Sequence, residues 1–209
     1  MTEVKICGLS TPETMDAALA AGADHVGFVH FAPSPRHLDV DALAWLAVRA
    51  RGRAGRVAVL VDPDDALIAA VAPHVDVVQL HGRETPERVA AVRARLPVWK
   101  GVGVRTAAEL REAAARFAHA DALVVDAKPP EGSALPGGNG VRLDWSIVSA
   151  ARPGGRWFLS GGLNAANVRQ AVSLARPGGV DVSSGVEDAP GVKSAARIQE
   201  FVKVVHGGR

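Results

Sequence analysis

The chain has 209 residues, of which 48% are hydrophobic and 4% aromatic, and it carries a formal net charge of +2 at pH 7. This length suits one large domain or two small ones, with ample material for a core. The single cysteine excludes an intrachain disulfide, and the absence of a signal peptide or a long apolar run predicts a cytoplasmic protein that does not enter a membrane.

Short, nearly continuous apolar runs recur along the chain and predict parallel strands that are covered on both faces. They occupy residues 4–7, 25–29, 57–61, 75–80, 98–104, 122–127, 157–161 and 180–185. Ala-rich amphipathic segments lie between these runs. The first is predicted to be a helix over 12–21, with Thr11 as its N-cap, Pro12 in its first turn and Gly22 after its end. The last carries one apolar stripe, formed by Ile198, Phe201, Val202 and Val205.

Eight alternating β and α units predict an α/β fold of the (β/α)8 barrel type, with eight parallel strands and about 26 residues per unit. A barrel of this size leaves no room for a second domain, so we expect a single barrel domain over 1–209. An open doubly wound sheet is the competing architecture. It would need a Gly-rich dinucleotide turn after the first strand, and CGLSTPE is not one.

Polar residues interrupt the apolar runs near the carboxyl ends of the strands, where barrels of this type build their active sites. Because alternate residues of a strand share a face, three pairs are expected to point together into the barrel: Gln79 with His81, Val124 with Asp126, and Asp181 with Ser183. A carboxylate inside ALVVDAK is hard to explain by packing, so Asp126 is a candidate functional residue. His81 is either a substrate-binding group or a strand-end histidine that is hydrogen-bonded for structure.

The single cysteine, Cys7, ends the first predicted strand and therefore lies on this rim. Lys5 should face inward one layer below it. We expect Lys5 to pair with Asp181 for structure, the alternative being that its charge favours a Cys7 thiolate. The surrounding anion-binding loops and helix N-termini are likewise expected to favour the thiolate.

Two glycine-containing turns follow the seventh and eighth predicted strands. FLSGGLNAANV (158–168) has a diglycine turn and then Asn164 as the expected N-cap of a helix, and VDVSSGVE (180–187) continues into Ser-Ser-Gly and a short helical turn. Glycines let the backbone approach a ligand, and helix N-termini favour anions. Because barrels of this type build phosphate sites at these two places, the turns predict a phosphorylated small-molecule ligand.

Several motifs together carry a family resemblance. In order from residue 4 to about residue 202, they are KICGL, SPRHL, VVQLHG, VVDAK, PGGNG with LDW, GGLNAANV and DVSSGVEDAPGVKSAARIQEFV. The chain resembles phosphoribosylanthranilate isomerase of tryptophan biosynthesis. The resemblance implies a cofactor-free Amadori rearrangement, in which the aminoaldose N-(5′-phosphoribosyl)anthranilate becomes the corresponding 1-deoxyribulose phosphate.

The resemblance also implies roles for individual residues. Cys7 matches the general base, Asp126 the general acid, and Arg36 of SPRHL the arginine that holds the anthranilate carboxylate. The phosphate loops are matched by Gly161, Gly162, Ser184 and Gly185. Two positions depart from the family pattern: Asn139 stands in PGGNG where Thr is usual, and Ser160 precedes the diglycine where Ala is common. The glycine-rich segment 129–140 is expected to close over the substrate.

The chemistry of this rearrangement requires an acid and a base with different pKa values in one pocket, and a carboxyl group and a thiol on separate strand ends can meet that requirement. An aldose-to-ketose shift needs an acid to open the furanose ring and a base to remove the C2 proton. No His, Cys and carboxylate cluster has metal-ligand spacing, so we predict no metal and no cofactor.

The densest basic stretch, 49–56, has no interleaved aromatic residues, which favours a solvated helix end over a nucleic-acid surface. A monomer or a homodimer is expected.

Two alternatives remain open at this point. A histidine-pathway isomerase would share the phosphate loops, but that family resembles a duplicated half-barrel with acidic residues at the ends of strands 1 and 5. Here those places hold Cys7 and the region of Val104 and Arg105, and LVDPDD after the third strand has no glycine. A non-catalytic binder of phosphorylated metabolites is the second alternative, although it would leave the acid and the base unexplained.

Overall fold

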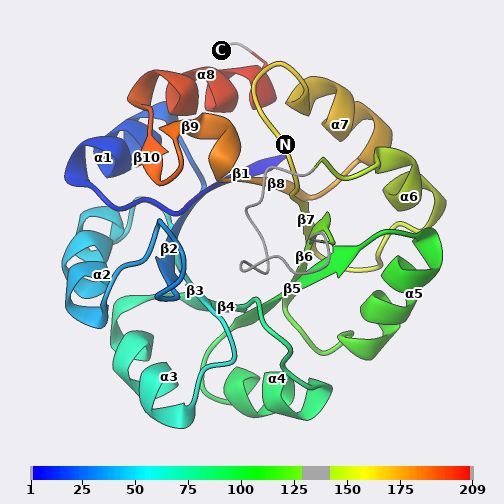
Figure 1. Ribbon diagram of the computed structural model, residues 1–209, viewed down its shortest axis with the longest axis horizontal. Helices are drawn as coiled ribbons and strands as arrows, with labels where there is room; N and C mark the ends of the chain where they lie inside the picture. Colours follow the sequence, from blue (N-terminus) through cyan, green and yellow to red (C-terminus); the bar gives the residue numbers. More distant parts are fainter. Residues whose placement is uncertain (1, 129–141, 208–209) are drawn as a thin grey trace.

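In the computed structural model, eight parallel strands form a closed barrel that is surrounded by helices (Figure 1). The structure describes residues 2–128 and 142–207. The barrel strands pair in chain order, and the last closes against the first. They are β1 (Glu3–Cys7), β2 (His25–His30), β3 (Gly55–Leu60), β4 (Val77–Leu80), β5 (Val98–Val104), β6 (Ala122–Ala127), β7 (Trp157–Leu159) and β8 (Gly179–Val182). The predicted (β/α)8 barrel is confirmed.

The helices cover the outside of the barrel, as Figure 1 shows. They are α1 (Pro12–Ala21), α2 (Val40–Ala47), α3 (Asp65–Val71), α4 (Pro86–Arg93), α5 (Ala107–Arg116), α6 (Trp145–Ala150), α7 (Val168–Ala175) and α8 (Ala195–Val205). The first helix has the predicted bounds, because the Thr11 side chain accepts a hydrogen bond from the Thr14 amide and Gly22 ends the helix with φ 87°. None of the helices in the described part of the chain is long and apolar enough to cross a membrane.

Strands β7 and β8 end earlier than predicted, and after β7 the reason is that the two following glycines turn the chain out of the sheet. Gly161 and Gly162 have φ of 88° and 65°, a left-handed conformation that a strand cannot continue. After β8 the chain forms the short 3-10 helix η3 (Ser184–Val186), which was predicted as a helical turn. It then forms an unpredicted antiparallel hairpin of β9 (Glu187–Ala189) and β10 (Val192–Lys193).

The predicted cap of α7 was wrong by one turn. The helix begins at Val168, directly after Asn167, rather than after Asn164. The Asn164 side chain still accepts hydrogen bonds from the amides of Ala166 and Asn167. Asn164 therefore caps the amides of the turn that leads into the helix.

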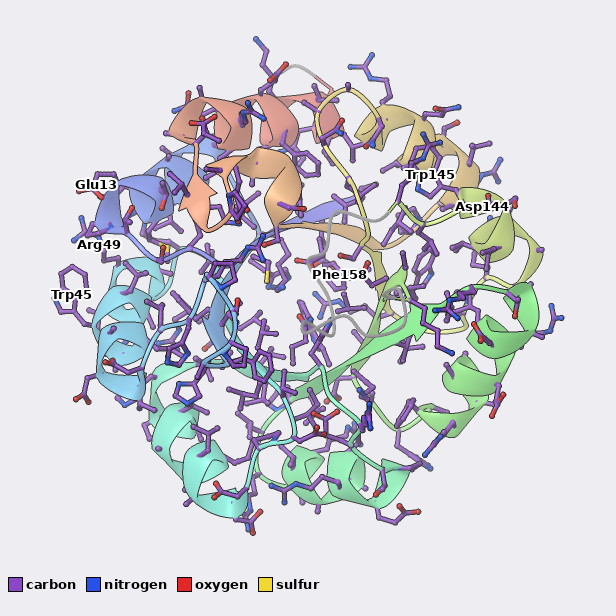
Figure 2. All side chains as sticks on the ribbon, in the orientation of Figure 1. Glu13, Trp45, Arg49, Asp144, Trp145 and Phe158 are labelled. Carbon is purple, nitrogen blue, oxygen red and sulfur yellow. The ribbon has the colours of Figure 1, made fainter. Side chains whose placement is uncertain are left out.

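Two apolar layers hold the barrel together. The larger lies between the strands and the surrounding helices. The smaller lies inside the barrel and consists of Val57, Val77, Trp99, Ala122, Val124 and Phe158. Trp99 and Phe158 stack with their ring centroids 4.4 Å apart, and Figure 2 shows Phe158 within the ring of strands, whereas Trp45 of α2 points away from the molecule. The aromatic pair fills the interior of the barrel, so no channel runs between the described strands. The polar residues at the carboxyl ends of the strands lie above this packed interior.

Candidate active site

The residues expected to carry chemistry meet at one rim of the barrel. Cys7 is the last residue of β1, Asp126 lies one residue before the end of β6, and His81 directly follows β4. Arg36 lies in the connection from β2 to α2. Because all eight strands are parallel, these positions share the carboxyl-end rim, where barrels of this type place their sites. Strands β7 and β8 separate the strand of Asp126 from that of Cys7.

The Cys7 thiol lies above a buried ion pair. Lys5 and Asp181 are paired in the register of β1 and β8, and Lys5 Nζ donates to Asp181 Oδ1 at 2.8 Å, as expected for the structural role. Gly27 of β2 is the register partner of Cys7. A Cβ at Gly27 would lie 3.0 Å from Cys7 Sγ and 3.1 Å from Lys5 Nζ. The missing side chain at Gly27 therefore leaves the space that the thiol and the ammonium group share, a requirement that the sequence did not indicate.

The protonation of Cys7 differs from the expectation. Burial raises the pKa of the Cys7 thiol above its ordinary value, the Lys5 and Lys193 ammonium groups oppose this rise, and the Asp181 carboxylate adds to it. The prediction that the surroundings favour the thiolate was therefore wrong in direction. The sequence showed the nearby positive charge of Lys5 but not that Cys7 would be only 7% exposed, and the effect of burial on the pKa dominates.

Asp126 lies against the diglycine turn that follows β7. Its Oδ1 accepts a hydrogen bond from the Ala127 amide at 2.7 Å, and the residue is 9% exposed. A Cβ at Gly161 would lie 2.7 Å from the same oxygen. Gly161 was predicted from its family position to serve the phosphate. In this structure its missing side chain also makes room for the Asp126 carboxylate.

Arg36 is held by Glu187, which in turn binds Lys193, and neither residue was predicted from the sequence as part of the site. Its Nε and Nη2 donate to the two carboxylate oxygens of Glu187, at 2.6 and 2.8 Å. Lys193 Nζ donates to Glu187 Oε1 at 2.5 Å. The stem of Arg36 crosses Gly8, where an added Cβ would lie 2.6 Å from Arg36 Cδ. The glycine that follows Cys7 therefore lets the arginine reach the rim, and the Pro-Gly turn in EDAPGVK was the signal for the hairpin that carries Glu187 and Lys193.

The two turns predicted to bind phosphate touch each other. A Cβ at Gly185 would overlap the carbonyl oxygen of Leu163, so the turn after β8 packs directly on the turn after β7. A Cβ at Gly162 would lie 2.8 Å from Arg142 Cα. Ser184 and Gly185 are partly exposed, and Asn167 Nδ2 supports the first turn by donating to Gly162 O at 2.9 Å. The two turns thus form one continuous backbone surface between the acid and the base, and their binding of phosphate stays a prediction.

His81 lies on the same rim, directly after β4. Gln79 Nε2 donates to His81 Nδ1 at 3.1 Å. Burial, reinforced by the positive charge of Lys100, lowers the pKa of His81 to about 4. The imidazole is therefore neutral near pH 7 and can exchange hydrogen bonds with a ligand without contributing charge. Its role as a substrate-binding residue stays a prediction.

Within residues 2–128 and 142–207, no group of three His, Cys, Asp or Glu side chains is arranged to hold a metal ion. The predicted lid, 129–140, lies outside the described residues, and so does Asn139. Ser160, the other departure from the family pattern, lies near the Lys5–Asp181 pair, where its Oγ donates to Asp181 Oδ2 at 3.4 Å.

Comparison with known proteins gives one consistent family. A family model described as N-(5'phosphoribosyl)anthranilate (PRA) isomerase matches residues 4–204. The N-(5'-phosphoribosyl)anthranilate isomerase of Azorhizobium caulinodans is 56% identical over 207 residues, which cover 97% of this chain and 91% of that relative. The crystal structure of phosphoribosyl anthranilate isomerase from Thermotoga maritima is 36% identical, with a TM-score of 0.89 over 99% of this chain and 100% of that chain. A solved phosphoribosyl anthranilate isomerase in complex with reduced 1-(o-carboxyphenylamino)-1-deoxyribulose 5-phosphate is 33% identical, with a TM-score of 0.84 and the same coverage.

Proposed function

The chain belongs to the N-(5'-phosphoribosyl)anthranilate isomerase family, and on that premise we propose that Cys7 and Asp126 are the base and the acid of an Amadori rearrangement. The protein is an aldose–ketose isomerase of tryptophan biosynthesis. The observation that carries the mechanism is the placement of the two groups on one rim, with the turns after β7 and β8 between them.

In the first step, Asp126 acts as general acid. Its carboxyl proton passes to the furanose ring oxygen as the bond from that oxygen to C1 breaks, and the nitrogen lone pair forms a C1=N bond. The transferred proton remains on the C4 hydroxyl, and Asp126 is left as a carboxylate. The hydrogen bond from the Ala127 amide to Asp126 Oδ1 fixes the orientation of the group and supports the resulting charge.

In the second step, Cys7 acts as general base. Its thiolate removes the C2 proton, and the electrons of the C2–H bond form a C1=C2 double bond while the C1=N electrons return to nitrogen. The resulting enolamine becomes the ketone when the proton of its C2 hydroxyl is lost and C1 gains a proton. Burial raises the pKa of Cys7, so the ionised thiol is a stronger base than an exposed one, at the cost of a smaller ionised fraction at neutral pH.

The ends of the substrate suit the remaining groups. Arg36 presents a planar fork for the anthranilate carboxylate, and the joined turns containing Gly162, Ser184 and Gly185 offer backbone amides to the phosphate. The ligand named for the similar solved complex carries both a carboxyphenyl group and a 5-phosphate. His81 is assigned to the sugar between them, as a neutral hydrogen-bonding group.

We further propose that residues 1–209 form one catalytic domain, which takes a phosphorylated small molecule and needs no metal or cofactor. The oligomeric state, monomer or homodimer, is to be measured by light scattering of the purified protein.

The test is turnover of N-(5'-phosphoribosyl)anthranilate by the purified protein, with the aminoketose product identified by mass and chromatography. Complementation of a tryptophan auxotroph that lacks this isomerase provides a second readout, and the substrate of the histidine-pathway isomerase is assayed in parallel. We expect turnover of the anthranilate substrate alone. Turnover of only the histidine-pathway substrate, or binding of phosphorylated compounds without any turnover, would contradict the proposal.

A further inference from the structure

One buried carboxylate at the rim is shared by two cations. Glu187 accepts two hydrogen bonds from Arg36 and one from Lys193, and all three residues are at most 7% exposed. Burial alone would raise the pKa of Glu187, but the hydrogen bonds from Arg36 and Lys193 lower it below its ordinary value. Glu187 is therefore ionised near neutral pH, and the cluster contains one fixed negative charge.

The contact with Glu187 occupies only one edge of the arginine. A guanidinium group can bind a carboxylate through its Nε–Nη2 edge or through its Nη1–Nη2 edge. Glu187 uses the first, since its partners are Nε and Nη2. Within the described part of the chain, nothing accepts a hydrogen bond from Nη1. The second edge is thus oriented by Glu187 and available to the carboxylate of a substrate.

Charge decides how strongly that second edge attracts an anion. Arg36 and Glu187 alone would form a neutral pair, and the repulsion of a second carboxylate by Glu187 would offset part of its attraction to Arg36. Lys193 changes this balance. Its Nζ donates to Glu187 Oε1 at 2.5 Å, to Ser183 O at 2.9 Å and to Ser183 Oγ at 3.1 Å. Three acceptors around one nitrogen match the three hydrogens of an ammonium group, so two cations face one anion.

We propose that Lys193 makes Arg36 available to the substrate carboxylate by neutralising Glu187, so that the cluster carries one uncompensated positive charge. The inference rests on the proposed function, in which Arg36 binds the anthranilate carboxylate. Lys193 acts through Arg36 and Glu187 rather than by touching that carboxylate, so it is a positioning residue. It is also a specificity determinant, because its effect exists only for substrates that carry the carboxylate.

The test compares two substrates in the full-length enzyme. One is N-(5'-phosphoribosyl)anthranilate, and the other is N-(5'-phosphoribosyl)aniline, which lacks the carboxylate. In Lys193→Met, kcat/KM for the anthranilate substrate should fall by roughly ten- to a hundredfold, mainly through KM, because a hydrogen bond to a charged group is weakened. The value for the aniline substrate should fall much less, because it has no carboxylate to sense the charge, whereas any effect of Lys193 on the Cys7 thiol acts equally on both substrates.

Two further variants test the charge itself. Lys193→Arg keeps the charge and should keep the preference for the anthranilate substrate. Adding Glu187→Gln to Lys193→Met removes the anion and leaves Arg36 as an uncompensated cation, so most of the lost preference should return. Lys100→Met is the matched control, since Lys100 forms another buried ion pair, with Glu84 at 2.9 Å. That control should lower the melting temperature and change both substrates in the same proportion.

The possible outcomes separate the inference from the proposed function. Equal losses for both substrates in Lys193→Met would overturn the inference, because they would assign Lys193 to the phosphate turn or to the Cys7 thiol. A double variant that is folded but no better than Lys193→Met would also overturn it. If the unmodified enzyme does not convert the anthranilate substrate, or if Arg36→Met leaves its preference unchanged, the proposed function fails first.

Discussion

Replacing Cys7 by alanine should separate catalysis from folding, because the change removes one buried sulfur atom and no charge. Cys7 is 7% exposed and its thiol lies beside Gly27, while Lys5 keeps its own partner in Asp181. Deleting a buried group of this size costs about 1 to 2 kcal/mol, as for a methyl or methylene group plus a small cavity. A domain with about 5 to 15 kcal/mol of stability remains folded after such a loss.

The expected effect on turnover exceeds this structural cost and does not depend on unfolding. A positioned base contributes typically about 10² to 10⁴ in rate, so kcat for Cys7→Ala should fall by at least about a hundredfold, or about 2.7 kcal/mol in activation free energy. Cys7→Ser should lose a similar amount. A serine hydroxyl would occupy nearly the same place, but it is much harder to ionise than a thiol near neutral pH.

The assay is steady-state turnover of the anthranilate substrate, with circular dichroism and thermal melting as measures of folding. Ile6→Val is the matched control, because Ile6 is the neighbouring residue of β1, is fully buried and faces the outer core. It should cost a comparable amount of stability, about 0.5 to 1.5 kcal/mol, and leave kcat unchanged. A folded Cys7→Ala protein with undiminished kcat would refute the assignment and return this cysteine to a packing role.

Other perturbations of the site have equally definite outcomes. Asp126→Asn should lower kcat by at least about a hundredfold and leave Cys7 open to alkylation by iodoacetamide; retained turnover would exclude Asp126 as the acid. Arg36→Met should raise KM by at least about tenfold, and an unchanged KM would remove Arg36 from the binding site. Because burial raises the pKa of Cys7 and the Lys5 ammonium opposes that rise, kcat/KM should increase with pH beyond the ordinary thiol range, and Lys5→Met should move this increase to still higher pH. A pH profile of folded Lys5→Met that coincides with that of the unmodified enzyme would contradict this. Exhaustive chelation should leave activity intact, and a loss that one divalent ion restores would contradict a metal-free mechanism.

The sequence was sufficient for the barrel, because a strand covered on both faces needs a continuous apolar run. The runs at 98–104 and 122–127 became β5 and β6 with unchanged bounds. The hairpin of β9 and β10 was not predicted, since its strands are short and carry buried charged residues, Glu187 and Lys193, that would argue against a strand in isolation. Local pattern therefore predicted the elements that pack by apolar area and missed the element held by ion pairs.

For the candidate site, position was predictable and environment was not. Strand alternation placed Cys7 and Asp126 on the rim, because parallel strands end on the same side of a barrel. The partners of Arg36 could not be found in this way, since Glu187 is 151 residues away in sequence. The direction of the Cys7 pKa shift was missed for a related reason. Burial depends on how the whole barrel closes, whereas sequence shows only which charges are available.

The ion pair beneath Cys7 joins residues that are far apart in the sequence, and this limits when the pair can form during synthesis. Lys5 and Asp181 are separated by 176 residues, so the pair cannot form until nearly the whole barrel has been translated. At about 5 to 20 residues per second, that interval lasts roughly 10 to 35 s. During this time β1 lacks one of its two neighbouring strands, and its apolar residues have no complete core to enter. The surroundings of the base are therefore completed on the ribosome only after about 176 further residues have been added beyond the strand that carries Cys7.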